Sequence, residues 1–226
     1  PGKDYLNPNI ELLVDDMLEQ SQRNKLISYL EKWLKNKIVT ILKSLFSLKD
    51  LQDKNSSIKA LAYQLYENNG VLKREQVLDY IKKLDQSDRK ILRDLGVKFG
   101  RYHVFLYKLI KPEPVSLRTL LWKNHHQKFF NLKPPTFGLN FLNNDKIKNK
   151  DFMLLCGFEK FDNSYVRIDI LERLFVQIIN SNTEGLKQIK MMPEMLNLLG
   201  CNKENFKQLL KKMNYKILEK NNEVFF

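Results

Sequence analysis

Hydrophobic residues recur at three- and four-residue steps over the first half of the chain, the spacing of amphipathic helices. The longest run predicts one helix over residues 21–48. Its apolar stripe consists of Leu26, Leu30, Trp33, Leu34, Ile38, Ile41, Leu42 and Leu45. Shorter helices are predicted over residues 56–69, 73–84 and 87–95, with Gly70 and Gly96 as stops. Asn7 before Pro8 indicates a further helix start. These patterns together predict a helical bundle.

The segment "VKFGRYHVFLYKLIKP", residues 97–112, interrupts this periodicity. Gly96 and Gly100 flank a short β-prone piece, and Pro112 and Pro114 mark its far end. A helix is predicted to resume over residues 115–122. Residues 134–151 then lack a clear period and contain Pro134 and Pro135, so they are predicted to be a linker or irregular loop between two domains.

The last third of the chain predicts a mixed α+β domain. A hairpin is expected to turn at residues 162–164, and Asp169 is expected to cap a helix with Glu172 in the capping-box position. The tail then predicts a helix, a turn at Gly200, a second helix and a pair of strands. This order resembles a small winged helix, with residues 203–213 in the place of a recognition helix.

The predicted fold class is therefore mainly α. It comprises a helical accessory domain over residues 1–133, the linker over 134–151 and a winged-helix-like domain over 152–226. The two cysteines, Cys156 and Cys201, are too few for a disulfide framework or a structural zinc site. They are interpreted as small hydrophobic residues in a reducing cytoplasm.

Positive charge is concentrated in one part of the chain. The formal net charge is +13, and residues 89–133 alone contain 11 basic and two acidic residues. Four of the eight arginines lie in this segment. Concentrated basic charge attracts polyanions, because each neutralised phosphate releases a condensed counterion. The alternative is charge that serves solubility in a lysine-rich protein.

Nucleic-acid contact is predicted for twelve residues. They are Arg89, Arg93, Lys98, Arg101, Tyr102, His103, Lys108, Lys111, Arg118, Lys203, Lys207 and Lys211. Lysine and arginine would follow the phosphate backbone, while Phe99, Tyr102 or Phe105 would stack on bases. Alternatively, the aromatic residues are buried in a strand and only the cations face outward. His103 would contact a base or phosphate, or be a buried structural histidine. The lysines of 203–211 equally fit the solvated face of a helix.

No pattern of a catalytic or metal site is present in the sequence. There is no G-x-x-x-x-G-K-[ST] motif, and the histidines do not occur in an H-E-x-x-H or H-x-E arrangement. No apolar run approaches the length of a membrane span. We therefore expect no enzymatic activity, no cofactor, no metal and no membrane partner for this chain, and a cytoplasmic location.

Residues 88–122, "DRKILRDLGVKFGRYHVFLYKLIKPEPVSLRTLLW", resemble the C-terminal region of alphaproteobacterial-type relatives of the mitochondrial RNA-degradosome helicase, a superfamily-two DExH-box family. The resemblance extends to "NIELLVDDML", "ALAYQLYENNGVLKRE", "YVRIDILERL" and "LLGCNKENFKQLLKKMNYKI". It covers most of the chain except residues 134–151.

This resemblance implies that the chain is a piece of a longer protein and follows two RecA-like domains. Those domains would hold ATP and magnesium, so no catalytic residue is carried over to this chain. The implied partners are single-stranded RNA, with DNA as the alternative, and the helicase core of the same protein. The leading hypothesis is an accessory region that contacts nucleic acid. The runner-up is a protein-interaction module that docks on the core or on a partner nuclease. A stand-alone winged-helix regulator would fit the tail but not the helical first half.

Overall fold

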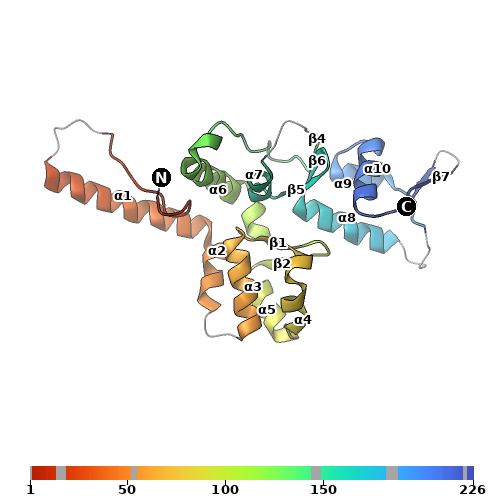
Figure 1. Cartoon of the computed structure of the whole chain (residues 1–226), viewed down its shortest axis with the longest axis horizontal. Coiled ribbons are helices and arrows are strands. Elements are labelled where there is room, and N and C mark those ends of the chain that lie inside the picture. Colours follow the sequence, from red (N-terminus) through yellow and green to blue (C-terminus); the bar gives the residue numbers. More distant parts are fainter. Residues whose placement is uncertain (1, 14–18, 52–54, 144–148, 182–187, 221–222) are drawn as a thin grey trace. The chain divides into compact units, whose positions relative to one another are not determined.

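A computed structural model describes residues 2–13, 19–51, 55–143, 149–181, 188–220 and 223–226. Among these residues helices predominate and the strands form small sheets, which confirms a mainly helical fold (Figure 1). The chain divides into two compact units. Unit 1 comprises Pro1–Gly70, Asp79–Val97 and Leu106–Pro134, and unit 2 comprises Val71–Leu78, Lys98–Phe105 and Pro135–Phe226.

Unit 1 is built from helices and short 3-10 turns. The elements are α1 (Gln20–Ile41), α2 (Lys43–Phe46), η1 (Ser47–Leu51), α3 (Ser56–Glu67), α5 (Gln86–Asp94), η3 (Tyr107–Ile110), α6 (Pro112–His125) and η4 (Gln127–Phe129). Helix α4 (Leu78–Lys83) begins at Leu78, which ends the unit 2 segment Val71–Leu78, and its other residues belong to unit 1. Leucines of the predicted helices α3 and α5, among them Leu61, Leu65 and Leu92, are fully buried. The predicted helix periodicity therefore identifies the core of this unit.

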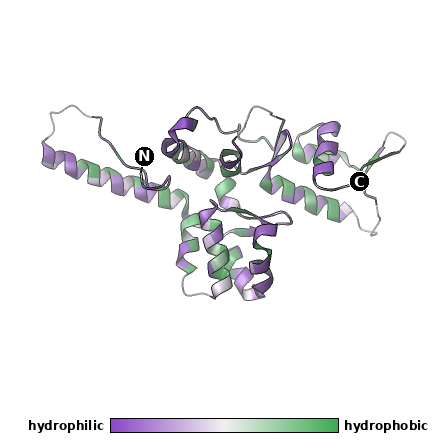
Figure 2. Ribbon diagram, viewed as in Figure 1, coloured by the Kyte–Doolittle hydropathy of each residue, from purple (hydrophilic) through white to green (hydrophobic). Residues whose placement is uncertain are grey.

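The long predicted helix is interrupted. Helix α1 ends at Ile41, and Leu42 leads into the short α2. Only the C-terminal part of the predicted stripe is buried, from Ile38 onward. By contrast, Tyr29 is 66% exposed and Trp33 is 55% exposed. Hydrophobic and hydrophilic residues alternate along this helix (Figure 2).

The helix start predicted at Asn7 and Pro8 is wrong for residues 8–13, which are not helical, while residues 14–18 lie outside the described ranges. The Asp4 carboxylate accepts hydrogen bonds from the backbone N–H groups of Leu6 and Asn7 and from the side-chain amide of Asn7. This local turn occupies the side chain that would otherwise cap a helix.

Arg118 lies on α6 with none of its surface exposed. Its guanidinium donates to the carbonyl oxygen of Asn69 at 2.8 Å and to that of Leu109 at 2.6 Å. Asn69 and Gly70 both have positive φ angles where the chain leaves α3. The Asn69 carbonyl in the turn after α3 and the Leu109 carbonyl in η3 would otherwise lack a helical partner. Arg118 supplies a donor to each of them.

Unit 2 contains the strands that position the candidate site. The first sheet has the order β1 (Val71–Lys73), β3 (His103–Leu106), β2 (Val97–Phe99), and Lys73 pairs with His103 in its antiparallel register. The second sheet has the order β4 (Phe141–Asn143), β6 (Ser164–Arg167), β5 (Phe158–Phe161). The predicted hairpin at residues 162–164 is confirmed by the pairing of β5 with β6.

The remaining elements of unit 2 are α7 (Lys150–Leu155), α8 (Ile168–Ser181), α9 (Pro193–Leu199), α10 (Lys203–Lys212), β7 (Leu218–Lys220) and β8 (Glu223–Phe225). The apolar face of α8, with Leu171 and Leu174, shares a core with Leu199 of α9 and Phe206 of α10. Gly200 ends α9 at a φ of 69°, as the sequence predicted for this turn.

The expected linker is partly structured. Residues 141–143 form β4 and pair with β6, because a buried Phe141 fits the core beside Val166. The boundary between the two units falls between Pro134 and Pro135, but unit 2 also takes residues 71–78 and 98–105 from the first half of the chain. Residues 144–148 of the expected linker lie outside the described ranges.

Replacing Arg118 tests its structural role. Arg118→Ala leaves the two carbonyls without these donors, so we expect the free energy of unfolding to fall by about 3 kcal/mol in urea titrations. Arg118→Lys keeps the charge but not the two-pronged donor geometry and should lose less. Equal stability of the alanine variant and the unmodified chain would contradict this role.

Candidate nucleic-acid interface

The hairpin turn between β2 and β3 is held by a single carboxylate. Glu172, on α8, accepts backbone hydrogen bonds from Arg101, from Tyr102 at 2.9 Å and from His103 at 2.8 Å. A side chain at position 100 would collide with this carboxylate, which explains why the turn carries Gly100. The turn at residues 100–103, here called the GRYH turn, is thereby fixed to the core helix α8.

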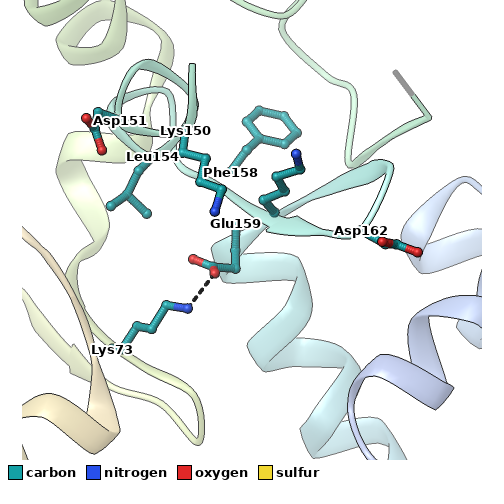
Figure 3. Close-up of a pocket in the computed structure, with 8 residues that line it drawn as sticks. Lys73, Lys150, Asp151, Leu154, Phe158, Glu159 and Asp162 are labelled. Carbon is teal, nitrogen blue, oxygen red and sulfur yellow. Dashed lines mark ion pairs between the residues drawn. The ribbon is translucent and has the colours of Figure 1, made fainter. Parts of the chain in front are cut away.

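His103 continues this network inward. Its ring nitrogen Nδ1 lies 3.3 Å from Oε1 of Glu172, and Nε2 lies 3.4 Å from Oε2 of Glu159. Glu159 in turn forms an ion pair with Lys73 at 2.9 Å (Figure 3). Figure 3 also shows Lys150 of α7 extending toward the same carboxylate.

These contacts shift two pKa values. Burial disfavours the charged form of His103, but its hydrogen bonds to Glu159 and Glu172 outweigh burial and raise its pKa above the ordinary value. Burial likewise opposes the charged form of Glu159, while hydrogen bonds from His103 and Lys73 lower its pKa. The two carboxylates on either side of the imidazole therefore favour its protonated form.

Glu172 does not act as the predicted capping-box partner of Asp169. Helix α8 begins at Ile168, and the Asp169 carboxylate accepts from the guanidinium of Arg167 at 2.7 Å. The backbone N–H groups of residues 101–103 donate to the Glu172 carboxylate. A charged acceptor that satisfies three donors contributes more there than it would by capping the N-terminus of one helix.

Arg101 and Lys98 are the exposed cations of the GRYH turn and its strand. The Arg101 guanidinium lies 5.6 Å from the centre of the Phe175 ring. Tyr102 packs edge-on against the same ring and is half-buried, and burial raises the pKa of its hydroxyl. Tyr102 is thus part of the support for Arg101, with only part of its surface accessible to a ligand.

Five of the predicted residues lie in unit 1, the buried Arg118 among them. Arg93, Lys108 and Lys111 are exposed, and Arg89 is half-buried with one guanidinium nitrogen donating to the carbonyl oxygen of Ile81 at 3.1 Å. Lys111 donates to the Tyr107 hydroxyl at 2.6 Å. The structure therefore distributes the basic segment over both units.

The three lysines of α10 differ in their surroundings. Lys207 is paired with Glu204 at 2.8 Å and with Glu219 of β7 at 2.7 Å. Lys211 is exposed and Lys203 is half-buried. Because two carboxylates already surround Lys207, its charge serves the attachment of β7 to α10 more directly than contact with a polyanion.

Two of the predicted contact residues are corrected by their burial. His103 is 2% exposed and Arg118 is fully buried, and both have their polar atoms directed at protein acceptors. Phe105 is buried in β3, as expected from the alternative that the aromatic residues lie in a strand and only the cations face outward. The GRYH region therefore combines inward aromatic and aliphatic side chains with outward cations.

Sequence analysis missed Glu172, Glu159 and Lys73 as partners of His103. The contacts between Glu172 and the turn join residues about 70 positions apart, and no local pattern marks such a pair. In the described part of the chain, no group of three or more histidine, cysteine or acidic residues is arranged to hold a metal ion. Nor does any helix within those ranges combine the length and apolarity needed to cross a bilayer.

Comparisons with protein-family models, curated proteins and solved structures found no match to this chain.

The role of Glu172 can be measured by substitution. Glu172→Ala leaves three backbone N–H groups without their acceptor, and we expect a loss of about 3 kcal/mol in the free energy of unfolding. Glu172→Gln keeps a carbonyl acceptor and should lose roughly half as much. Arg173→Ala, at the exposed neighbouring position, is the matched control. A loss as small as that of the control would show that Glu172 does not anchor the turn.

Stability should also depend on pH through His103. Because its pKa is raised in the folded chain, protonated His103 contributes stability that is complete below about pH 6.5 and is lost as the pH rises through the folded value. Urea unfolding at a series of pH values should show this decline above about pH 6.5. His103→Gln should remove it, and parallel curves for the two proteins would rule out the assignment.

Proposed function

We propose that this chain is a C-terminal accessory region of an ATP-dependent RNA helicase and contacts single-stranded nucleic acid through its basic segment. The observation that carries the proposal is the GRYH turn, where the Glu172 carboxylate fixes the backbone and leaves Lys98 and Arg101 facing outward. The resemblance of residues 88–122 to a helicase family supplies the class of protein. ATP and magnesium would be held by the RecA-like domains, and no residue of this chain is assigned to them.

Rigid presentation of cations suits binding of a flexible strand. A single strand loses conformational freedom when bound, so preorganised contacts on the protein lower the total cost of association. Phosphate contacts of lysine and arginine are independent of sequence, as a helicase that moves along RNA requires. His103 lies between Glu159 and Glu172, and Glu159 also pairs with the exposed Lys73, which leaves Arg101 as the uncompensated cation of the turn.

We further propose that residues 152–226 have the winged-helix arrangement. The order α8, α9, α10 and the β7–β8 pair supports it. Ile189 and Met191 also exchange backbone hydrogen bonds with Phe226 and Val224, which places an additional extended segment beside β8. Residue Lys211 would then project from the helix in the recognition position.

A second candidate function is docking on another protein, such as the helicase core or a partner nuclease. The exposed apolar residues of α1 favour it, because Leu26, Tyr29 and Trp33 follow one another at helical spacing and are 38%, 66% and 55% exposed. Aromatic residues in such a patch are typical of protein interfaces.

Fluorescence anisotropy with a labelled single-stranded RNA at several salt concentrations tests the first function. We expect micromolar binding that weakens steeply with salt. The Arg93→Glu/Lys98→Glu/Arg101→Glu variant should bind at least about tenfold more weakly and with a smaller salt slope.

The control is Lys25→Glu/Lys32→Glu/Lys35→Glu on α1, which makes the same change in net charge at exposed positions. Unchanged affinity in the first variant would overturn the assigned contact residues. Equal losses in both variants would indicate attraction by net charge alone. No binding at low salt would favour the docking function.

A further inference from the structure

Beside the GRYH turn, unit 2 contains a cleft with a volume of about 480 Å³. Its walls come from the end of β1 and η2 (Arg74–Val77), from the turn itself, from β5 and from the C-terminal end of α10. The volume is in the range of sites that bind small ligands, about 300 to 1,000 Å³. None of these residues except Arg101, Tyr102 and His103 was singled out by the sequence.

The cleft is lined by more cations than anions. Four basic residues, Lys73, Arg74, Arg101 and Lys212, face two acidic ones, Glu75 and Glu159, which gives the lining a net charge of +2. The Glu159 carboxylate is already matched by Lys73 and His103, so its repulsion of an incoming anion is reduced. The chemistry of the cleft therefore favours an anion.

Arg74 is held in place for such a ligand. One of its guanidinium nitrogens donates to the carbonyl oxygen of Gly100 at 2.7 Å. Arginine carries five N–H donors in a rigid fork, so this one bond orients the guanidinium and leaves other N–H donors for a ligand. Arg101 projects from the backbone that Glu172 fixes, and Lys212, which lies 3.5 Å from the Asp162 carboxylate, lines the cleft from the C-terminal end of α10.

Apolar groups complete the cleft. The ring of Phe161 and the thioether of Met213 line it, and both side chains are half-buried. A planar ring beside guanidinium groups is a common arrangement for a nucleotide, whose base stacks while its phosphate accepts charged hydrogen bonds. Methionine adapts to the shape of such a base.

We propose that this cleft binds one nucleotide of the single strand, with its phosphate at Arg74, Arg101 and Lys212 and its base against Phe161 and Met213. This inference rests on the proposed function and assigns to it a defined subsite. It also brings into the interface residues 74 and 212, which lie outside the basic segment of residues 89–133.

The test uses the whole chain labelled with ¹³C at its methionine methyl groups. Uridine 5′-monophosphate is the probe, and uridine and inorganic phosphate are titrated separately. We expect the Met213 methyl signal to shift with the nucleotide and to shift less with either part alone. Lys212→Glu should weaken nucleotide binding about tenfold, the effect of losing one charge-assisted contact. Lys216→Glu, an exposed lysine that does not line the cleft, should bind as the unmodified chain does.

The outcomes separate this inference from the proposed function. A Met213 signal that does not move, in a chain that still binds the long RNA, would overturn the cleft and leave the function intact. Nucleotide binding at the cleft without binding of the long RNA would support the subsite and overturn the contact with a strand. A shift of equal size with inorganic phosphate alone would overturn the base contact, and equal losses in Lys212→Glu and Lys216→Glu would overturn the assignment of Lys212.

Discussion

The arrangement of the candidate interface depends on the Glu172 carboxylate. This one group accepts three backbone hydrogen bonds from the GRYH turn and also faces the His103 ring. Charge-assisted hydrogen bonds of this kind are stronger than neutral ones, and removing the acceptor would leave several donors without partners at once. Because Leu171 and Leu174 bury the same helix in the core of unit 2, the turn is fixed to an element of that core.

As a consequence, the charged side chains of this region form two sets, one facing the interior of unit 2 and one facing solvent. Inward, the buried His103 lies between Glu159 and Glu172, and Glu159 also pairs with the exposed Lys73, so both carboxylates have partners within the protein. Outward, Lys98 and Arg101 remain exposed to solvent. The same backbone segment thus places a neutralised network on one side and uncompensated cations on the other, and only the latter can attract a phosphate at a distance.

Periodicity predicted the elements whose stability is local. The helices of unit 1, the hairpin after Phe161 and the turn at Gly200 follow from hydrophobic spacing and turn residues. The predictions from the sequence are wrong where a long-range or competing contact determines the local structure. Asp4 withdraws Asn7 from helix capping, Phe141 draws part of the expected linker into a sheet, and Glu172 binds a turn about 70 residues away. None of these contacts leaves a periodic signal in the sequence.

For the same reason, the net charge of a segment does not by itself identify a binding surface. Formal charge counts Arg118 and Lys207 equally with Arg101, yet Arg118 donates to two backbone carbonyls and Lys207 is paired with two glutamates. Conversely, Arg74 and Lys212 line the cleft beside the turn, although both lie outside the basic segment of residues 89–133. A surface that attracts phosphate is therefore defined by which cations keep donors available after their contacts within the protein and converge in space. That property arises in the folded chain, where Glu172 holds the backbone from which Arg101 projects and the Gly100 carbonyl orients Arg74.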